Sequence, residues 1–458
     1  MGEKNLHFIS IGGSVMHSLA ITLKKKGYKV TGSDDEIYEP SYSNLKAHGI
    51  LPKEMGWNEN NIHKDLDAVV IGMHAKGDNP EVLKARNLGL KTYSFPEYVR
   101  KECENKHRIV VAGSHGKTTI TAIIMHVLKY ANRDFDYLIG ASVDGFDNLV
   151  QITEAPLIII EGDEYFSSPV DKTPKFLKYD HHNAIISGIA WDHINAFPTA
   201  EDYERQFELF ADNTPKSGNL FYYQNDPRLA AICNRERKSI TVTAYTEHPA
   251  VVRNGNTYLK TFSSEIPIKI FGRHNLQNIQ AALEMVKKLG IKEETFYQAI
   301  SSFKGASKRL QLLGQSDQTA VYLDYAHAPS KVKATVSALK EQMPERKLVA
   351  CFELHTYSSL NPEFIEQYYG SLDSADEAAI FVNPENIKHK DKAQLNADDI
   401  VKGFHKTGLQ VFFDRAALDT YLKNQKWSNK NLLLMSSGNF ASMDVKTFVS
   451  EILGKLAD

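Results

Sequence analysis

Short apolar runs alternate with segments of helical periodicity along the first hundred residues. Residues 7–11 and 68–71 have the pattern and length of strands, the second one buried, and residues 28–31 predict a further short strand between them. Between residues 7–11 and 28–31, apolar side chains recur every three or four positions over residues 15–23, which predicts an amphipathic helix. Because strand–helix–strand connections build parallel sheets covered by helices, the pattern predicts a helix-covered α/β sheet here.

The same alternation continues in two further segments. Residues 108–112 and 157–160 predict strands, and residues 120–131 carry apolar side chains on one helical face. Residues 220–270 are richer in strand patterns. Beyond residue 313 strands are predicted at 320–323, 348–352, 379–382, 411–413 and 432–435. A chain of 458 residues has room for about three domains. We therefore predict an α/β protein with domains at residues 1–104, 105–312 and 313–458.

Composition narrows the class of protein. Lys plus Arg number 54 and Asp plus Glu 56, so the net charge of −2 argues against a main role in binding nucleic acid or a membrane surface. No apolar stretch approaches the ~18 residues of a membrane helix. The three cysteines lie far apart, which favours reduced thiols over a disulfide framework. We expect a cytoplasmic enzyme with small-molecule substrates, and neither nucleic acid nor membrane as partner.

Residues 113–119, Gly-Ser-His-Gly-Lys-Thr-Thr, follow a predicted strand and open a predicted helix, as a phosphate-binding loop does. Glycines let backbone N–H groups turn toward phosphate oxygens, and the helix N-terminus attracts negative charge. Lys117 would then contact the β- and γ-phosphates, and Thr118 would offer its hydroxyl to Mg²⁺. The spacing is unusual, because the first glycine lies three rather than five positions before the second. The alternative is an ordinary strand–turn–helix corner with a surface lysine, but the flanking elements favour phosphate binding.

Nucleotide chemistry also needs a carboxylate beside the metal ion. Glu161 ends the apolar run 157–160, so it would lie at the carboxyl end of a buried strand, where α/β sheets bind ligands. The alternative for Glu161 is a solvated acidic turn. His193 follows another apolar run, residues 184–186, where a neutral imidazole could ligate a metal; the alternative is a hydrogen-bonded structural histidine.

Taken together, six motifs resemble the Mur ligase family, the ATP-dependent ligases that add amino acids to the peptidoglycan precursor. They stand in family order across nearly the whole chain, at residues 113–119, 161–164, 192–193, 272–278, 308–309 and 324–327. The resemblance implies that ATP phosphorylates a substrate carboxylate to an acyl phosphate, which an incoming amine attacks. It also implies a Rossmann-like UDP-sugar domain, a central P-loop ATPase-type mixed sheet, and a C-terminal Rossmann-like domain that binds the amino component.

The resemblance also implies roles for individual residues. Lys117, His193 and Arg309 would be catalytic, and Thr118, Glu161 and His193 would bind Mg²⁺. The implied ATP site comprises Gly113, Ser114, His115, Gly116, Lys117, Thr118, Thr119, His274, Asn275, Asn278, Arg309 and Asp324. Within this set, His274, Asn275 and Asn278 would line the adenine and Asp324 the ribose. The incoming amino component would meet His327 and His355.

The first glycine turn fits the same family. Gly12, Gly13 and Ser14 resemble its UDP-binding turn, and Ser33 and Asp34 follow where the next strand ends. Without the family, this turn could be a dinucleotide fingerprint in which the acidic residue holds a ribose. The third glycine of that fingerprint is missing, so a diphosphate-sugar nucleotide fits better than NAD.

Different segments resemble different branches of the family. Residues 32–40 resemble the branch that joins the murein tripeptide L-Ala-γ-D-Glu-meso-diaminopimelate to UDP-N-acetylmuramate during peptidoglycan recycling, as do residues 164–165, 171–176 and 435–440. Residues 352–358 partly resemble the branch that adds L-alanine in de novo synthesis. We favour the tripeptide as the amine, with L-alanine as the alternative.

The sequence also differs from some members of the family and from other classes of nucleotide-binding protein. Several family members carry a carbamylated lysine about fifteen residues beyond the metal histidine, but residues 200–212 contain no lysine, so we predict no carbamate. A folate polyglutamate ligase would lack the domain before the phosphate loop. The other rivals are an NAD-dependent oxidoreductase and a silent nucleotide-binding protein. We expect a monomer or a weak homodimer.

Overall fold

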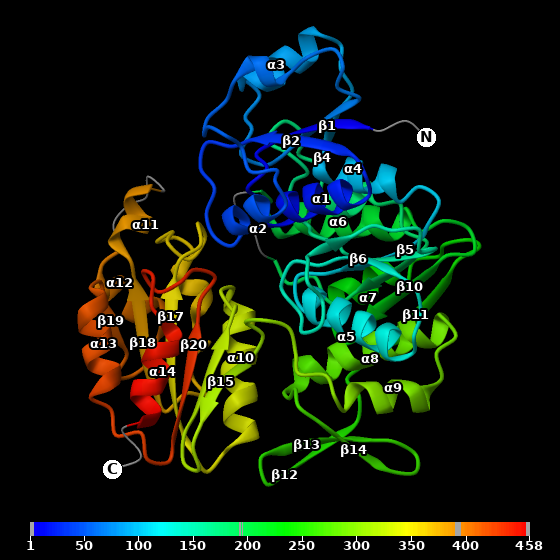
Figure 1. The fold of residues 1–458 in the computed structure, drawn as a ribbon. Helices are drawn as coiled ribbons and strands as arrows, with labels where there is room; N and C mark the ends of the chain where they lie inside the picture. The colour runs from blue at the N-terminus through cyan, green and yellow to red at the C-terminus, as the bar shows by residue number, and fades with distance from the viewer. Residues whose placement is uncertain (1–3, 192–193, 195, 390–394, 455–458) are drawn as a thin grey trace. The chain divides into compact units, whose positions relative to one another are not determined.

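The N-terminal sheet has four parallel strands in the order β2-β1-β3-β4 (Figure 1). The computed structural model describes residues 4–191, 194, 196–389 and 395–454. The strands are β1 (Asn5–Ile9), β2 (Lys29–Ser33), β3 (Ala68–Ile71) and β4 (Thr92–Ser94). The helices are α1 (Ser14–Lys25), α2 (Ser41–Ala47), α3 (Pro80–Asn87) and α4 (Phe95–Glu102), with a 3₁₀ turn η1 (Glu59–Asn61). The predicted strand–helix alternation is therefore present.

The central sheet has seven strands in the order β11-β10-β9-β5-β8-β6-β7. Its strands are β5 (His107–Ala112), β6 (Asp136–Leu138), β7 (Val150–Gln151), β8 (Leu157–Glu161), β9 (Asn183–Ile186), β10 (Asn219–Tyr223) and β11 (Thr241–Tyr245). Only β7 runs antiparallel to its neighbour, so the sheet is mixed, as expected. The helical elements are α5 (Lys117–Tyr130), α6 (Ala200–Asp212), α7 (Pro227–Cys233) and the 3₁₀ turn η2 (Lys175–Lys178). Strand β5 lies between β8 and β9, so the loop after it starts from the middle of the sheet.

A small antiparallel sheet and two helices follow in the chain. The strands are β12 (Ala250–Arg253), β13 (Asn256–Lys260) and β14 (Glu265–Ile268), and the helices are α8 (Arg273–Lys288) and α9 (Glu293–Ile300). Helix α8 begins directly after Gly272, whose φ of +91° is a left-handed conformation that favours glycine.

The C-terminal sheet has six strands in the order β15-β16-β20-β17-β18-β19, and only β15 is antiparallel to its neighbour. The strands are β15 (Gln311–Gln315), β16 (Ala320–Asp324), β17 (Lys347–Leu354), β18 (Glu377–Val382), β19 (Gln410–Phe412) and β20 (Lys430–Met435). The helical elements are α10 (Pro329–Gln342), η3 (Ile365–Tyr368), α11 (Pro384–His389), α12 (Ala397–Phe404), α13 (Arg415–Lys423) and α14 (Val445–Gly454). Separate apolar clusters pack the two faces, with α10 and α12 over one and α13 and α14 over the other.

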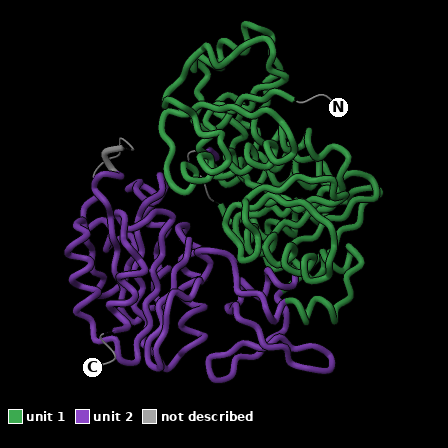
Figure 2. Tube along the Cα trace, in the orientation of Figure 1, with its two compact units in different colours: residues 1–191, 199–246, 281–299 green, residues 192–198, 247–280, 300–458 purple. Residues whose placement is uncertain are grey.

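The chain divides into two compact units (Figure 2). The first comprises residues 1–191, 199–246 and 281–299, and the second residues 192–198, 247–280 and 300–458. The first unit therefore holds both the N-terminal and the central sheet, and the second holds the small and the C-terminal sheets. The boundaries at residues 104 and 312 stay a prediction.

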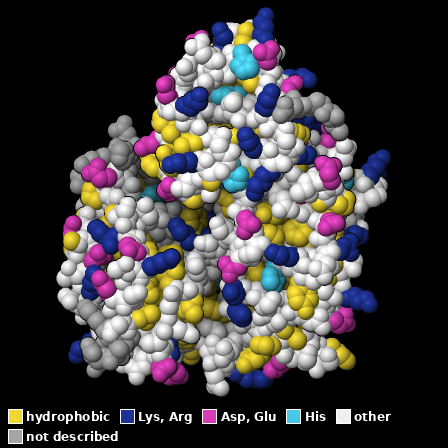
Figure 3. Space-filling view, in the orientation of Figure 1, with side chains coloured by type: hydrophobic (Ala, Val, Ile, Leu, Met, Phe, Trp, Pro, Cys, Tyr) yellow, Lys and Arg dark blue, Asp and Glu magenta, His cyan; other side chains and the backbone are white. Residues whose placement is uncertain are grey.

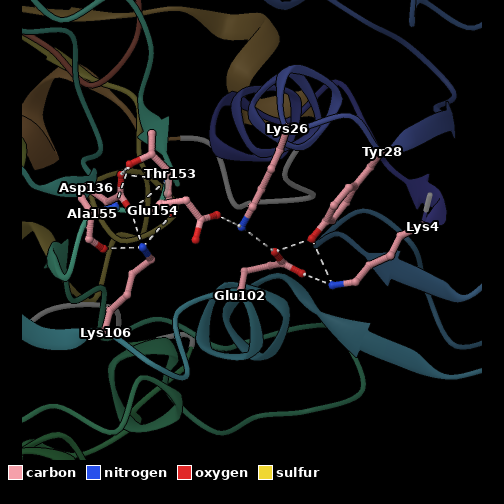
Figure 4. Close-up of polar contacts among 9 residues, drawn as sticks. All are labelled: Lys4, Lys26, Tyr28, Glu102, Lys106, Asp136, Thr153, Glu154 and Ala155. Atoms are coloured by element: carbon pink, nitrogen blue, oxygen red, sulfur yellow. Dashed lines mark hydrogen bonds and ion pairs between the residues drawn. The ribbon is translucent and has the colours of Figure 1, made fainter. Parts of the chain in front are cut away.

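Glu102, at the end of α4, binds polar side chains from the segments that precede β1 and β2 (Figure 4). Its carboxylate accepts hydrogen bonds from Lys4 Nζ at 3.1 Å and Tyr28 Oη at 3.0 Å, and Lys26 Nζ lies 3.5 Å away. Lys26 also lies 3.8 Å from Glu154, which follows β7. Because the Glu102 side chain is only 3% exposed, these contacts tie the end of α4 to the segments that precede β1 and β2 through a buried charge, and the exposed Lys26–Glu154 contact reaches the central sheet.

Further contacts hold the start of β5 within the central sheet and α1 against β7. Lys106 Nζ lies 2.9 Å from the buried carboxylate of Asp136 and donates to the carbonyl of Thr153 at 2.8 Å. On the other side, Thr22 of α1 donates to the Val150 carbonyl of β7 at 2.6 Å. Helix α1, which starts at the first glycine turn, is therefore held against the edge of the central sheet through Thr22.

Charges of both signs are interspersed on the face in view of Figure 3, as the near-neutral composition predicts. Among the described helices, none is long and apolar enough to cross a membrane. The three cysteines, Cys103, Cys233 and Cys351, are buried and carry no disulfide.

Candidate functional site

The predicted phosphate loop lies between β5 and α5, and its glycines have conformations that other residues rarely adopt. Gly113 has a φ of +131°, and a Cβ there would lie 2.3 Å from Ser187 Oγ. Gly116 has a φ of +77° and precedes α5 directly. The Ser114 N–H donates to the Gly188 carbonyl at 2.9 Å, so the loop is packed against the end of β9. The glycine positions are therefore required by the backbone path, independently of any ligand.

Lys117, the first residue of α5, reaches back into this loop. Its ammonium donates to the Gly113 carbonyl at 2.6 Å and to Glu164 Oε2 at 2.6 Å. Burial by itself would lower the pKa of Lys117, but the carboxylates of Glu164 and Asp163 outweigh it and raise the pKa. Lys117 is therefore a largely buried, charged ammonium at the start of a helix, the position at which a phosphate group would be held.

Thr118 and Glu161 lie together, as the predicted metal site requires. The Thr118 hydroxyl donates to Glu161 Oε1 at 2.7 Å, and the Gly140 N–H donates to Oε2 at 2.7 Å. A hydroxyl and a carboxylate are hard oxygen donors of the kind that Mg²⁺ prefers. The residues present therefore fit a magnesium ion between the loop and the end of β8.

Other loop residues offer polar groups to a phosphate. The Ser114 side chain is 1% exposed, and its hydroxyl has no hydrogen-bond partner within the described part of the chain. A buried hydroxyl without a partner is costly, so this one suits a polar ligand. His115 and Thr119 belong to the same segment, and Thr119 is buried on α5. His193, the predicted second metal ligand, lies outside the described residues, as does Asp192.

The predicted UDP-binding turn stands at the N-terminus of α1. Gly12 donates its N–H to Asp34 Oδ2 at 2.7 Å, and a Cβ on Gly12 would lie 2.9 Å from that oxygen. Gly13 precedes α1 and Ser14 is its first, exposed residue. Burial raises the pKa of Asp34 to about 6, against the lowering effect of the Gly12 N–H. The turn and Asp34 are thus brought together across β1 and β2.

Ser33 has a different partner from the one expected. Its hydroxyl is buried and donates to Glu81 Oε2. Glu81 also accepts from the Asn58 N–H at 2.9 Å and from Asn61 Nδ2 at 2.8 Å, and His7 Nε2 lies 3.3 Å away. Ser33 therefore fixes the end of β2 within this polar cluster, and a role in UDP-sugar binding stays a prediction.

The predicted adenine residues lie in the second unit at the start of α8. Asn275 is buried and donates to the Phe271 carbonyl at 2.8 Å, and Asn278 donates to Asn275 Oδ1 at 3.3 Å. Burial lowers the pKa of His274 to about 4, which keeps its imidazole neutral near pH 7. The three side chains therefore lie on one turn of a helix.

Asp324 and Arg309 lie together in the second unit. Asp324 Oδ2 accepts from the Leu310 N–H at 2.6 Å, and Oδ1 accepts from the Ala326 N–H at 2.7 Å. Burial raises the pKa of Asp324, while the Arg309 guanidinium acts to lower it. The Arg309 guanidinium lies 4.8 Å above the Tyr325 ring. These contacts show Asp324 holding two loops, and its predicted contact with the ribose stays a prediction.

The two histidines assigned to the amino component lie on different loops of the C-terminal sheet. His327 Nδ1 is 2.9 Å from the Tyr325 carbonyl. His355 follows β17, with Nδ1 3.3 Å from Ser437 Oγ after β20. Since β17 and β20 are neighbours, these residues stand at the same carboxyl edge of the sheet.

Sequence reasoning missed Glu164 and Tyr203 as neighbours of the phosphate loop. Glu164 binds Lys117, and the Tyr203 hydroxyl donates to Glu164 Oε1 at 3.2 Å. The acidic segment after β8 was the available signal for Glu164. In the sequence, Tyr203 occupies an ordinary apolar position of the segment that forms α6. Its local pattern therefore gives no sign of the contact with Glu164.

Family comparisons agree with this arrangement of sheets. The Mur ligase family catalytic domain matches residues 5–107, the Mur ligase middle domain residues 111–286, and the Mur ligase glutamate ligase domain residues 308–438. A UDP-N-acetylmuramate–L-alanine ligase of Caldicellulosiruptor bescii is 31% identical over 389 residues, which cover 81% of this chain and 82% of the relative.

Solved structures share the fold. A UDP-N-acetylmuramate–alanine ligase from Thermotoga maritima has a TM-score of 0.74 at 20% identity, covering 98% of this chain and 99% of that one. A UDP-N-acetylmuramate:L-alanyl-γ-D-glutamyl-meso-diaminopimelate ligase from Neisseria meningitides has a TM-score of 0.60 at 27% identity, covering 66% and 99%. The chain therefore belongs to the Mur ligase family of ATP-dependent ligases, with the family's three-domain α/β fold.

Proposed function

We propose that the protein joins the carboxylate of UDP-N-acetylmuramate to the amine of L-Ala-γ-D-Glu-meso-diaminopimelate, using ATP, in peptidoglycan recycling. The observation that carries the ATP-dependent step is the grouping of Lys117, Thr118 and Glu161 around one phosphate loop. These residues supply a cation, a hydroxyl and a carboxylate at the carboxyl ends of two neighbouring strands, β5 and β8. A triphosphate and its metal ion need this combination of groups.

In this reaction a carboxylate oxygen of the sugar attacks the γ-phosphorus of ATP, and the bond to ADP breaks. The amine nitrogen then attacks the carbonyl carbon of the acyl phosphate, and the tetrahedral intermediate expels inorganic phosphate as the amine loses a proton. Lys117 would screen the negative charges that meet in the first step, and Arg309 would contact the transferring group. Mg²⁺ held by Thr118 and Glu161 would draw charge from the phosphate oxygens.

The sugar substrate is proposed from the N-terminal turn and from the relatives. Gly12 and Gly13 open α1 at the carboxyl edge of a parallel sheet, which suits a diphosphate. The relatives in C. bescii and T. maritima are named for UDP-N-acetylmuramate, and so is the N. meningitides enzyme. We therefore assign the UDP-sugar to the first unit, and we place the reaction in the cytoplasm as an expectation.

The proposal also names the amine substrate, for which there are two candidates. The tripeptide is supported by residues 32–40 and 435–440 and by the likeness to the N. meningitides ligase. L-Alanine is the second candidate, because the relative at 31% identity is named as an L-alanine ligase and residues 352–358 resemble that branch. The incoming amine would meet His327 and His355 in either case.

A phosphate-release assay separates the two amines. It contains ATP, Mg²⁺ and UDP-N-acetylmuramate, with either L-alanine or the tripeptide, and a control without amine. We expect the tripeptide to give the higher kcat/KM. A preference for L-alanine would identify the de novo branch instead. Release with neither amine above the control would contradict the ligase assignment for this sugar.

A further inference from the structure

The ammonium of Lys117 is held by a carboxylate in this structure. Its Nζ lies 2.6 Å from Glu164 Oε2 and 2.6 Å from the Gly113 carbonyl. A lysine ammonium has three donors, so two are engaged by these acceptors. The Glu164 side chain is 1% exposed, and a charge-assisted hydrogen bond is strong where water is excluded.

Glu164 is itself held from the other side. The hydroxyl of Tyr203 donates to Glu164 Oε1 at 3.2 Å. Tyr203 is fully buried on α6, where its ring packs edge-on against Phe207 at 5.1 Å between centroids. The carboxylate is therefore oriented by a rigid side chain and directed at the lysine.

The preceding acidic residue does not share this role. Asp163 binds Lys175 at 2.6 Å, and its side chain is 40% exposed. Two adjacent carboxylates thus pair with two different lysines, and only Glu164 hydrogen-bonds to Lys117. The hydrogen bond to Lys117 therefore depends on the position of Glu164 and not on the general acidity of the segment.

We propose that Glu164 is a positioning residue that holds Lys117 in the loop before nucleotide binds and competes with the phosphates of ATP for its ammonium. This inference rests on the proposed role of Lys117 in binding the phosphates. To reach a phosphate oxygen of ATP, Lys117 Nζ must leave the Glu164 carboxylate. The free energy of breaking this ion pair therefore weakens the binding of ATP. Removing the charge of Glu164 while keeping its shape therefore strengthens ATP binding, whereas damage to a purely structural residue would weaken it.

The test is calorimetric titration of the full-length protein with a non-hydrolysable ATP analogue and Mg²⁺. In Glu164→Gln the amide oxygen can still accept from Lys117 or from Tyr203, but the ion pair is lost. We expect its Kd to fall about tenfold, the scale set by one hydrogen bond to a charged group. The melting temperature and UDP-N-acetylmuramate binding are measured on the same samples to show that the variant is folded.

Asp163→Asn is the matched control, because it removes one charge from the same segment while leaving both hydrogen-bond acceptors of Lys117 in place. Its Kd should stay within about twofold of the parent value, as for a partly exposed charge. An unchanged or higher Kd for Glu164→Gln, or an equal gain in Asp163→Asn, would overturn the inference. If the unmodified protein did not bind the analogue at all, the proposed ATP site would fail as well, so the two failures are distinguishable.

Discussion

The hydroxyl of Thr118 and the carboxylate of Glu161 lie 2.7 Å apart, although 43 positions separate them in the chain. Strands β5 and β8 are paired in parallel, with Val111 opposite Glu161, and this register brings the end of β8 beside the start of α5. A backbone N–H from Gly140 fixes the second oxygen of Glu161. The residues of the proposed metal site are therefore brought together by sheet register rather than by sequence proximity.

Replacing Glu161 with Gln should reduce phosphate release by about 100-fold, because an amide lacks the charge that Mg²⁺ needs. Part of the loss should be recovered at high Mg²⁺. The measurement is the initial rate of phosphate release against MgCl₂ concentration. Thr118→Ser is the matched control, since it keeps the hydroxyl, and it should stay within about tenfold of the parent. Equal rates in Glu161→Gln and the parent at every Mg²⁺ concentration would refute the assignment.

Lys117→Ala should abolish phosphate release while leaving UDP-N-acetylmuramate binding nearly intact. The variant should also lose stability, by about 3–5 kcal/mol, because Glu164 would be left buried without the lysine. Urea unfolding and calorimetric UDP-sugar binding measure the two effects separately.

The double variant Lys117→Met with Glu164→Gln provides the control for that result. It removes both charges together, so we expect most of the stability to return while phosphate release stays absent. Recovery of activity in the double variant would show that Lys117 is not needed for the chemistry. Parallel loss of UDP-sugar binding and phosphate release in Lys117→Ala would place the lysine outside the ATP site.

Local patterns predicted the longer buried strands and the phosphate loop, because apolar runs and glycine turns leave a signal within a few residues. The short strands β4, β6, β7 and β15 were missed, since two to five residues carry too little pattern and Gly314 and flanking polar residues interrupt that of β15. The hydrogen bond from the Ser33 hydroxyl to Glu81, 48 positions away, was not foreseen, and the predicted role of Ser33 in UDP-sugar binding stays a prediction. Contacts of that range depend on how β2 and α3 lie in the fold, and no local spacing encodes them. The left-handed φ values of Lys308 and Leu310, on either side of Arg309, were likewise invisible.

The buried contacts of Glu102 predict how stability depends on pH. Burial tends to raise the pKa of Glu102, but Lys4, Tyr28 and Lys26 outweigh it and lower the pKa below its ordinary value of about 4.3. The contribution to stability is therefore fully present above about pH 4.3 and is lost as the pH falls through the folded-state pKa. Glu102→Gln should cost about 1–3 kcal/mol at pH 7, and the difference from the parent should shrink near pH 3.

Urea unfolding at the two pH values measures this dependence. Glu154→Gln is the control, because Glu154 lies 3.8 Å from Lys26 but is 95% exposed. Its effect should stay within about 0.5 kcal/mol at both pH values. A cost for Glu102→Gln that grows as the pH falls would contradict a lowered pKa for Glu102 in the folded protein.

Arg309→Ala should lower turnover more than ATP affinity if the guanidinium acts on the transferring phosphoryl group. The side chain is held 4.8 Å above the Tyr325 ring, and its Nη1 donates to the Lys308 carbonyl at 3.0 Å. Flanking left-handed residues at Lys308 and Leu310 fix the backbone that carries it, a kind of strain that is common at functional sites. We expect kcat to fall by about 100-fold and the Kd for ATP to change by less than about threefold. Arg309→Lys keeps the charge but loses the planar guanidinium, so its kcat should be intermediate. An effect confined to ATP affinity would mean that Arg309 binds the ground state only.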